Sequence, residues 1–150
     1  MSLSQEERAL IVSMQMEKSA RFLTEAETVA GLGLWDVVSN RIYYAVFPAV
    51  AALLIHDGIE VHSHKGAGLM FGRKYVMTGI FTPEDGRLYA KLQDLREKSD
   101  YNLVYQSNEQ EMKPLLEKSK GLIARINAYI AGLVRCVVSG MWRTVSIRID

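Results

Sequence analysis

The polar residues that stand out as candidates for chemistry lie in an otherwise apolar stretch of the first third of the chain. Asn40, Arg41 and Tyr44 stand three and four residues apart within Ser39–Ala45, a spacing that puts them on one edge of a helix. A guanidinium, an amide and a phenol beside an apolar stripe must be hydrogen-bonded if they are buried. Two interpretations follow: a structural polar network between helices, or a pocket in which Arg41 holds a phosphate group.

A second candidate is the segment His62-Ser63-His64-Lys65-Gly66. A helix that begins here would present free backbone N–H groups, which together with His64 and Lys65 favour an anion. The two histidines also suggest a metal, but they supply only two ligands, and no carboxylate stands at a helical spacing to complete the set. We therefore expect no metal and no other cofactor. The alternative to an anion site is an ordinary capped loop.

A third candidate closes the helix expected before Tyr101. Arg96 and Asp100 are four residues apart, so they either form an exposed ion pair or leave Arg96 to share a phosphate with Tyr101. Arg73 adds a cation in a stretch without acids, residues 61–82. The sequence has no phosphate-binding glycine loop, no Rossmann fingerprint, no His-Glu-x-x-His motif and no nucleophile elbow.

The composition is that of one packed domain. The 150 residues are 49% hydrophobic and 23% charged, with 18 basic and 17 acidic side chains and a net charge of +1. This composition excludes a disordered chain and argues against a polyanion binder with a dominant basic charge. The charge is uneven, because residues 1–60 hold 4 basic and 8 acidic side chains, whereas residues 61–150 hold 14 and 9. The second part therefore carries either solvated helix faces or a local basic surface for an anion or an acidic partner.

Cysteine content and hydropathy indicate a cytoplasmic protein outside the membrane. Cys136 is the only cysteine, so the chain has no internal disulfide and no cysteine-based zinc site. The first residues are polar and lack a signal-peptide core. The longest apolar stretch, Ile42–Ile55, is 14 residues and contains Pro48, whereas a membrane span needs about 20.

The elements that position these residues are predicted to be helices. Ser4 and Glu7 form a capping box, and the helix they begin runs to the Gly31–Gly33 break. We expect a central apolar helix from Leu34 to His56, because its apolar residues recur every three and four positions. On the first helix, the stripe predicted to face the core is Leu10, Ile11, Met14, Phe22, Leu23 and Ala26.

Three further helices complete the prediction. A short one, weakened by glycines, covers residues 63–78, and Thr82-Pro83-Glu84-Asp85 is a strong start for the next. The last helix begins near Asn108 or after Pro114 and carries its stripe on to Val137. The tail alternates with the period of a strand but is too short to assign. We predict an all-α, up-and-down bundle of four to five helices over residues 1–139, with a tail of undetermined order over 140–150.

Several motifs together resemble those of the HEPN domain (higher eukaryotes and prokaryotes nucleotide-binding). They are the run Ser-Asn-Arg-Ile-Tyr-Tyr-Ala-Val-Phe-Pro from Ser39, then Ser-His-Lys-Gly from Ser63, Phe-Gly-Arg-Lys-Tyr from Phe71 and Leu-Arg-Glu-Lys-Ser-Asp-Tyr from Leu95. The resemblance covers roughly residues 5–135. It implies an all-α bundle, commonly a homodimer, that is often paired with a minimal nucleotidyltransferase as a toxin–antitoxin system.

The resemblance also implies a site, from which this sequence departs. Many HEPN proteins are metal-independent ribonucleases whose arginine is followed, four to six residues on, by a histidine across the dimer groove. After Arg96 the matching positions hold Asp100, Tyr101 and Asn102. A tyrosine with an ordinary pKa near 10 is a poor acid–base group at neutral pH. Whether the chain is an enzyme therefore stays open at this point.

Three functions follow from these observations. The first is a dimeric module that binds nucleotide or RNA and engages a nucleotidyltransferase. The second is a ribonuclease in which Arg96 stabilises the scissile phosphate and Asp100 or Tyr101 takes an altered role. The third is a structural helical oligomer without a ligand. The predicted ligand-binding residues are Asn40, Arg41, Tyr44, His64, Lys65 and Arg73, and the predicted catalytic residues are Arg96, Asp100 and Tyr101.

Overall fold

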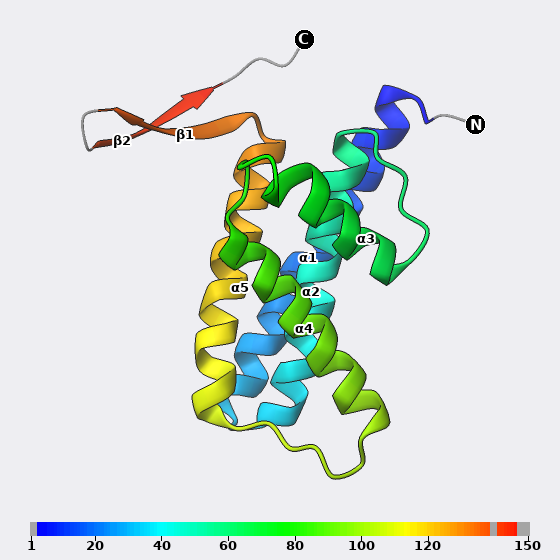
Figure 1. Ribbon diagram of the computed structural model, residues 1–150, viewed down its shortest axis with the longest axis vertical. Coiled ribbons are helices and arrows are strands. Elements are labelled where there is room, and N and C mark those ends of the chain that lie inside the picture. The colour runs from blue at the N-terminus through cyan, green and yellow to red at the C-terminus, as the bar shows by residue number, and fades with distance from the viewer. Residues whose placement is uncertain (1–2, 139–140, 147–150) are drawn as a thin grey trace.

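The computed structural model describes residues 3–138 and 141–146, which form a helical bundle with a hairpin at one end (Figure 1). The predicted all-α fold is confirmed, since helices make up the whole packed body. The elements are α1 (Gln5–Gly31), α2 (Trp35–His56), α3 (His64–Phe71), the π turn η1 (Gly72–Val76), α4 (Pro83–Tyr101), α5 (Glu109–Ile130), β1 (Leu133–Val138) and β2 (Met141–Ser146).

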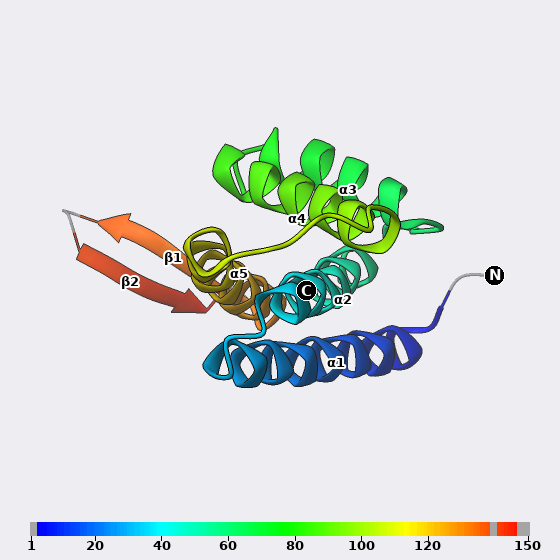
Figure 2. The same ribbon diagram turned by 90° about the horizontal axis from the view of Figure 1, so that it is seen from below.

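The helices lie in three layers. Figure 2 shows α1 on one side, α2 and α5 in the middle, and α3 with α4 on the other side. The middle helix α2 contacts α1, α3, α4 and α5. The core is therefore built around α2, as the sequence predicted.

Capping residues set the helix starts. The Ser4 hydroxyl accepts from the Glu7 N–H at 3.1 Å, and the Thr82 hydroxyl accepts from the Asp85 N–H at 3.2 Å. In both cases the acidic side chain accepts a hydrogen bond from the backbone N–H of the capping residue. Asn108 caps α5, so that helix starts before Pro114. These starts were predicted because each cap depends on residues only three positions apart.

The apolar helix α2 is long and apolar enough to cross a membrane. However, 72% of its most apolar window is buried inside the bundle. Val38, Ile42, Ala45, Ala49 and Leu53 are all fully buried. The buried stripe of α2 predicted from its three- and four-residue spacing is therefore confirmed from Val38 to Leu53. It packs against the other helices of the bundle.

The face of α1 that packs against the core differs from the predicted stripe. Leu10 and Met14 were expected inside but are 61% and 59% exposed. Ala26 of the predicted stripe is buried, and Phe22 and Leu23 pack partly buried against the core. The other two buried residues, Val12 and Ser19, were not predicted, and with Ala26 they are spaced by seven. The small Ser19 lets α1 approach α2 closely, and its hydroxyl donates to the Ala45 carbonyl at 2.6 Å. A narrow, small-residue contact between helices gives no strong hydropathy signal.

The predicted third helix is shorter than expected and ends in a different geometry. Residues 63–78 were expected to be one helix, but α3 ends at Phe71 and continues as the wider π turn η1. Within it, Ala67, Phe71 and Tyr75 are buried at four-residue spacing. The glycines of this segment explain the weak helical pattern.

The end of α5 corrects a second expectation. Leu133 and Val137 were placed on the last helix, but α5 ends at Ile130 and both residues belong to β1. Gly132 has a φ of 76°, the left-handed conformation that terminates helices, and the run after it is rich in β-branched residues. β1 pairs with β2 in an antiparallel hairpin. The expected division at residues 139–140 lies outside the described residues and stays a prediction.

Candidate functional site

Two predicted residues from different helices, His64 and Arg96, meet around Tyr43. The Tyr43 hydroxyl lies 2.6 Å from Nδ1 of His64. The Arg96 guanidinium carbon lies 5.4 Å from the centroid of the Tyr43 ring, within cation–π distance. The sequence places His64 and Arg96 32 positions apart, so only the fold joins them. We call Tyr43, Tyr44, Phe47, His64, Tyr89 and Arg96 the Arg96 cluster.

The start of α3 holds His64 in place. The Ser63 hydroxyl accepts from the Gly66 N–H at 2.9 Å and caps the helix. The Tyr89 hydroxyl, on α4, donates to the His64 carbonyl at 3.4 Å. A Cβ at Gly68 would lie 2.7 Å from the Tyr89 ring, so this glycine is what allows α3 to pack so closely on α4.

Aromatic rings from α2 fix the orientation of the imidazole. The ring of His64 stacks on Phe47 with centroids 4.0 Å apart and lies 5.8 Å from Tyr43. Tyr43 in turn meets Tyr44 edge-on at 5.5 Å. Tyr43 is 1% exposed, whereas His64 is half-buried. The imidazole therefore lies at the edge of the core, between two aromatic rings and solvent.

Burial and the Arg96 charge set the protonation of the cluster. Burial, and then the positive charge of Arg96, lower the pKa of His64. Burial raises the pKa of Tyr43, with Arg96 opposing it. The hydroxyl of Tyr44 raises the pKa of Arg96. At neutral pH the cluster thus holds a neutral imidazole, a neutral phenol and a permanent cation.

Arg96 is a partly exposed cation. Its side chain is 26% exposed, and its Nε lies 3.6 Å from a carboxylate oxygen of Asp100. That distance is an ion pair but too long for a hydrogen bond, and the buried Nε has no hydrogen-bond partner among the described residues. Because the Nε atom itself is buried, an anion would contact the exposed part of the Arg96 side chain and not this atom.

Of the other predicted residues, Tyr44 belongs to this cluster, whereas Arg41 and Asn40 do not. Arg41 turns toward α1, where its Nε lies 3.5 Å from a Glu25 carboxylate oxygen and its guanidinium covers the Phe22 ring at 5.4 Å. Of the two interpretations offered for Arg41, this contact fits the structural network. Asn40 is half-buried on α2.

The remaining candidates are exposed. Tyr101 is 82% exposed, in contrast to the half-buried Arg96. Lys65 and Arg73 lie on the outer side of α3 and η1. His62, whose side chain is 84% exposed, pairs with Glu60 at 3.4 Å. Among the described residues, no group of three His, Cys, Asp or Glu side chains converges as metal ligands would.

Sequence reasoning missed Tyr43, Phe47 and Tyr89. Tyr43 and Phe47 lie in the apolar stretch Ile42–Ile55, where an aromatic residue is most often part of the core, and Tyr89 was not singled out. The four-residue spacing of Tyr43 and Phe47 places them on one helix face. Their role as ring neighbours of His64 depends on how α3 crosses α2, which the local sequence does not contain.

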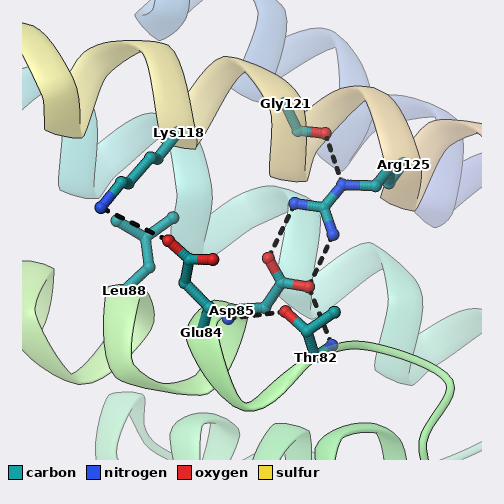
Figure 3. Close-up of a pocket in the computed structure, with 7 residues that line it drawn as sticks. All are labelled: Thr82, Glu84, Asp85, Leu88, Lys118, Gly121 and Arg125. Atoms are coloured by element: carbon teal, nitrogen blue, oxygen red, sulfur yellow. Dashed lines mark hydrogen bonds and ion pairs between the residues drawn. The ribbon is translucent and has the colours of Figure 1, made fainter.

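A second polar site, between α4 and α5, is already satisfied internally. Figure 3 shows Asp85 and Arg125 facing each other in a pocket of about 290 Å³. Two guanidinium nitrogens of Arg125 donate to the Asp85 carboxylate at 2.6 and 2.7 Å, and Asp85 is 4% exposed. Burial raises the pKa of Asp85, but Arg125 and Thr82 outweigh it and hold the pKa below its usual value. This pair is a structural lock between the two helices.

A third polar group lies at the C-terminal end of α2, around Asp57. One oxygen of the Asp57 carboxylate accepts from the Tyr75 hydroxyl at 2.6 Å and from the Tyr129 hydroxyl at 2.8 Å, and the other lies 2.9 Å from Nδ1 of His56. Burial, with the Asp57 hydrogen bond, raises the pKa of Tyr129 to about 12. These contacts tie α2, η1 and α5 together.

The protein is thus an all-α bundle that carries a half-buried arginine and a half-buried histidine at one edge. The HEPN domain family matches residues 12–129. This chain belongs to the HEPN domain family.

Several curated proteins are similar to this chain. A "UPF0332 protein" of Thermotoga maritima is 34% identical over 96 residues, which cover 64% of this chain and 73% of that protein. "Putative toxin MJ0142" of Methanocaldococcus jannaschii is 25% identical over 115 residues, 77% of this chain and 78% of that protein. "Putative toxin MJ0605" of the same organism is 31% identical over 86 residues, 57% and 63% of the two chains.

Proposed function

We propose that this chain is a toxin-like HEPN module that binds RNA or a nucleotide through a phosphate group at the Arg96 cluster. The observation that carries the proposal is the partly exposed guanidinium of Arg96, which lies against the Tyr43 ring at the edge of the core. Two relatives with toxin in their names support the toxin-like part.

The chemistry of the cluster suits this ligand class. A guanidinium is the preferred cation for a phosphate because its N–H groups match two phosphate oxygens. The partly exposed ring of Tyr44 lies beside it and offers a surface for a base, since stacking on aromatic side chains is the usual way that unpaired bases are held. A neutral His64 adds a hydrogen-bonding group without adding charge.

Binding is tested with a fluorescent single-stranded RNA oligonucleotide and with ATP at low salt, where phosphate contacts are strongest. We expect Arg96→Ala to weaken binding by at least about tenfold, the range of a charge-assisted contact. Arg21→Ala, which removes an exposed arginine from α1, is the matched control and should bind like the wild type. Equal binding by all three proteins would contradict the proposal. No binding by the wild type would favour the structural oligomer without a ligand.

A metal-independent ribonuclease is the second candidate function, because His64 and Arg96 both lie against the Tyr43 ring, so an imidazole accompanies this arginine although no histidine follows it in the sequence. In the tautomer whose Nδ1–H donates to the Tyr43 hydroxyl, Nε2 keeps a free lone pair. Nε2 would take the proton of an RNA 2′-hydroxyl as its oxygen bonds to the adjacent phosphorus. The phosphorus–5′-oxygen bond then breaks, the 5′-oxygen takes a proton from water, and Arg96 stabilises the charge on the phosphate.

Cleavage is tested on purified protein in excess chelator. We expect the wild type to cleave RNA, and Arg96→Ala and His64→Ala to lose at least about a hundredfold in rate, as general-base removal does. His62→Ala, two residues away and exposed, is the matched control. Because the pKa of His64 lies below 6.5, the rate should persist below pH 6.5 and fall only as His64 becomes protonated. Cleavage unaffected by His64→Ala would contradict this role, and no cleavage at all would leave the binding module.

We also propose a homodimer that engages a nucleotidyltransferase partner. The family membership supports this assembly, and so does the charge difference between the two parts of the chain. Sedimentation of the purified protein tests the dimer, and a monomer at micromolar concentration would contradict it. Co-elution with the product of a neighbouring nucleotidyltransferase gene tests the partner, and separate elution of the two proteins would contradict it.

A further inference from the structure

The outer face of α3 and η1 carries a regular row of alternating basic and apolar side chains. Lys65, Leu69, Arg73 and Met77 follow one another at four-residue spacing, and all four are exposed. Leu69 is 50% exposed and Met77 is 81% exposed. We call these four residues the basic–apolar row. Large apolar side chains held in solvent at a regular spacing indicate a surface for binding.

The fold keeps this row straight and turned outward. The buried residues Ala67, Phe71 and Tyr75 have the same four-residue spacing, displaced by two positions, so they occupy the opposite side of the helix. In an α-helix a four-residue step overshoots one turn by about 40°. The π turn at Gly72–Val76 has more residues per turn and reverses part of that drift.

The charge of this surface is of one sign. No acidic residue occurs from Val61 to Pro83. Among the described residues, Lys65, Arg73 and the neighbouring Lys74 form no ion pair. Figure 2 shows α3 and α4 in the layer opposite α1. The cations of the row are therefore available to an acidic partner.

We propose that the basic–apolar row binds an acidic amphipathic helix of a partner protein. A helix with Glu and Leu at the same four-residue spacing would set its acids against Lys65 and Arg73 and its apolar side chains against Leu69 and Met77. Methionine suits such a contact because its flexible side chain adapts to different shapes. This binding surface goes beyond the phosphate site at the Arg96 cluster and does not depend on it.

The side chains favour a protein over a nucleic acid. Surfaces that bind single-stranded RNA place aromatic rings among their cations, because bases stack on them. The exposed apolar residues here are aliphatic: Leu69, Met77 and Ile80, the last also 50% exposed. Aliphatic side chains between cations match the apolar and acidic residues of a protein helix.

The test measures fluorescence anisotropy of a synthetic helical peptide with Leu and Glu at four-residue spacing along one face. A second peptide with Ser in place of each Leu, and a single-stranded RNA, are the comparison probes. We expect the wild type to bind the Leu–Glu peptide about tenfold more tightly than the Ser–Glu peptide. Arg73→Glu and Met77→Ser should each weaken binding of the Leu–Glu peptide by about tenfold.

The controls change the same residue types on α1. Arg21→Glu and Met14→Ser are exposed substitutions on the other outer layer and should leave peptide binding unchanged. Circular dichroism confirms that each variant is folded, and Lys65→Glu is a second variant of the row if Arg73→Glu is not. No peptide binding by the wild type, or equal loss in the α1 variants, would overturn the proposal. RNA binding that Arg73→Glu abolishes, with peptide binding intact, would overturn it in favour of a nucleic-acid surface.

Discussion

The positive charge of Arg96 is one of two causes that lower the pKa of the His64 imidazole. The other cause, burial, does not depend on this arginine. The guanidinium and the imidazole both lie against the Tyr43 ring, so the charge acts over a short distance in a poorly solvated place. The electrostatic contact of these two residues is therefore measurable without any ligand.

We expect Arg96→Gln to raise the pKa of His64, because it removes the charge and leaves the burial nearly unchanged. The measurement is an NMR titration of the His64 ring protons. Arg73→Gln, on the outer side of η1, is the control and should leave the titration as in the wild type. An unchanged pKa in Arg96→Gln would mean that the two groups do not interact in solution.

Asp85 is a buried charged residue that stabilises the fold through its partners. Its carboxylate binds Arg125 and completes the capping box of α4. We expect Asp85→Ala to lower the free energy of unfolding by about 2–3 kcal/mol, since it removes both the cap and the ion-pair partner of Arg125. Urea denaturation measures this change.

The adjacent residue provides the control for Asp85. Glu84 is exposed and lies 3.5 Å from Lys118. Glu84→Ala should change the free energy of unfolding by less than about 1 kcal/mol, the usual size for a solvent-exposed ion pair. Equal losses of unfolding free energy in the two variants would show that the Asp85–Arg125 pair contributes no more to stability than an exposed ion pair.

At the scale of elements, the close contact of α3 with α4 depends on one glycine. A Cβ at Gly68 would lie 2.7 Å from the Tyr89 ring, whereas a Cβ at Gly72 would meet nothing within 4 Å. We expect Gly68→Ala to destabilise the protein by about 1–3 kcal/mol through overpacking. The same variant should weaken RNA binding, because it shifts the start of α3 and with it His64.

Gly72→Ala is the matched control for the Gly68 substitution. Its φ of −59° suits any residue, so the free energy of unfolding should stay the same or rise by up to about 1 kcal/mol. Thermal unfolding followed by circular dichroism compares the two variants. Destabilisation by Gly72→Ala and not by Gly68→Ala would contradict the packing described for α3 and α4.

At the scale of the whole molecule, the three helical layers form one body and the hairpin is an extension of it. Among the described residues, the hairpin contacts the helices only at the end of α5 (Figure 1). The core around α2 includes residues from every helix and from η1 but, among the described side chains, none beyond Ile130. The core residues that the structure describes therefore all lie in the helices and η1 and in the segment between η1 and α4.

We expect a chain that ends at Gly132 to keep the helical circular dichroism of the full protein and to unfold in a single cooperative transition. Its midpoint in urea should lie close to that of the full chain, because the truncated chain keeps every core residue that the structure describes. The full-length chain is the control. Loss of cooperative unfolding, or aggregation on truncation, would show that the hairpin covers part of the bundle.

The sequence by itself determined where most helices begin and which helix is central. The capping boxes at Ser4 and Thr82 work through residues three positions away, and the apolar period of α2 is read along a single segment. The same local reasoning found Arg96 and His64 as separate candidates. These features were predictable because their causes lie within one or two helical turns.

The tertiary structure alone decided which candidates meet. His64 joins Arg96 because α3 packs on α4 at Gly68, and Arg41 turns away because α1 places Glu25 and Phe22 beside it. The inward face of α1 depends on a small-residue crossing at Ser19, which hydropathy does not reveal. Contacts of this kind depend on how whole helices cross, and that follows from packing the entire core and not from any one segment.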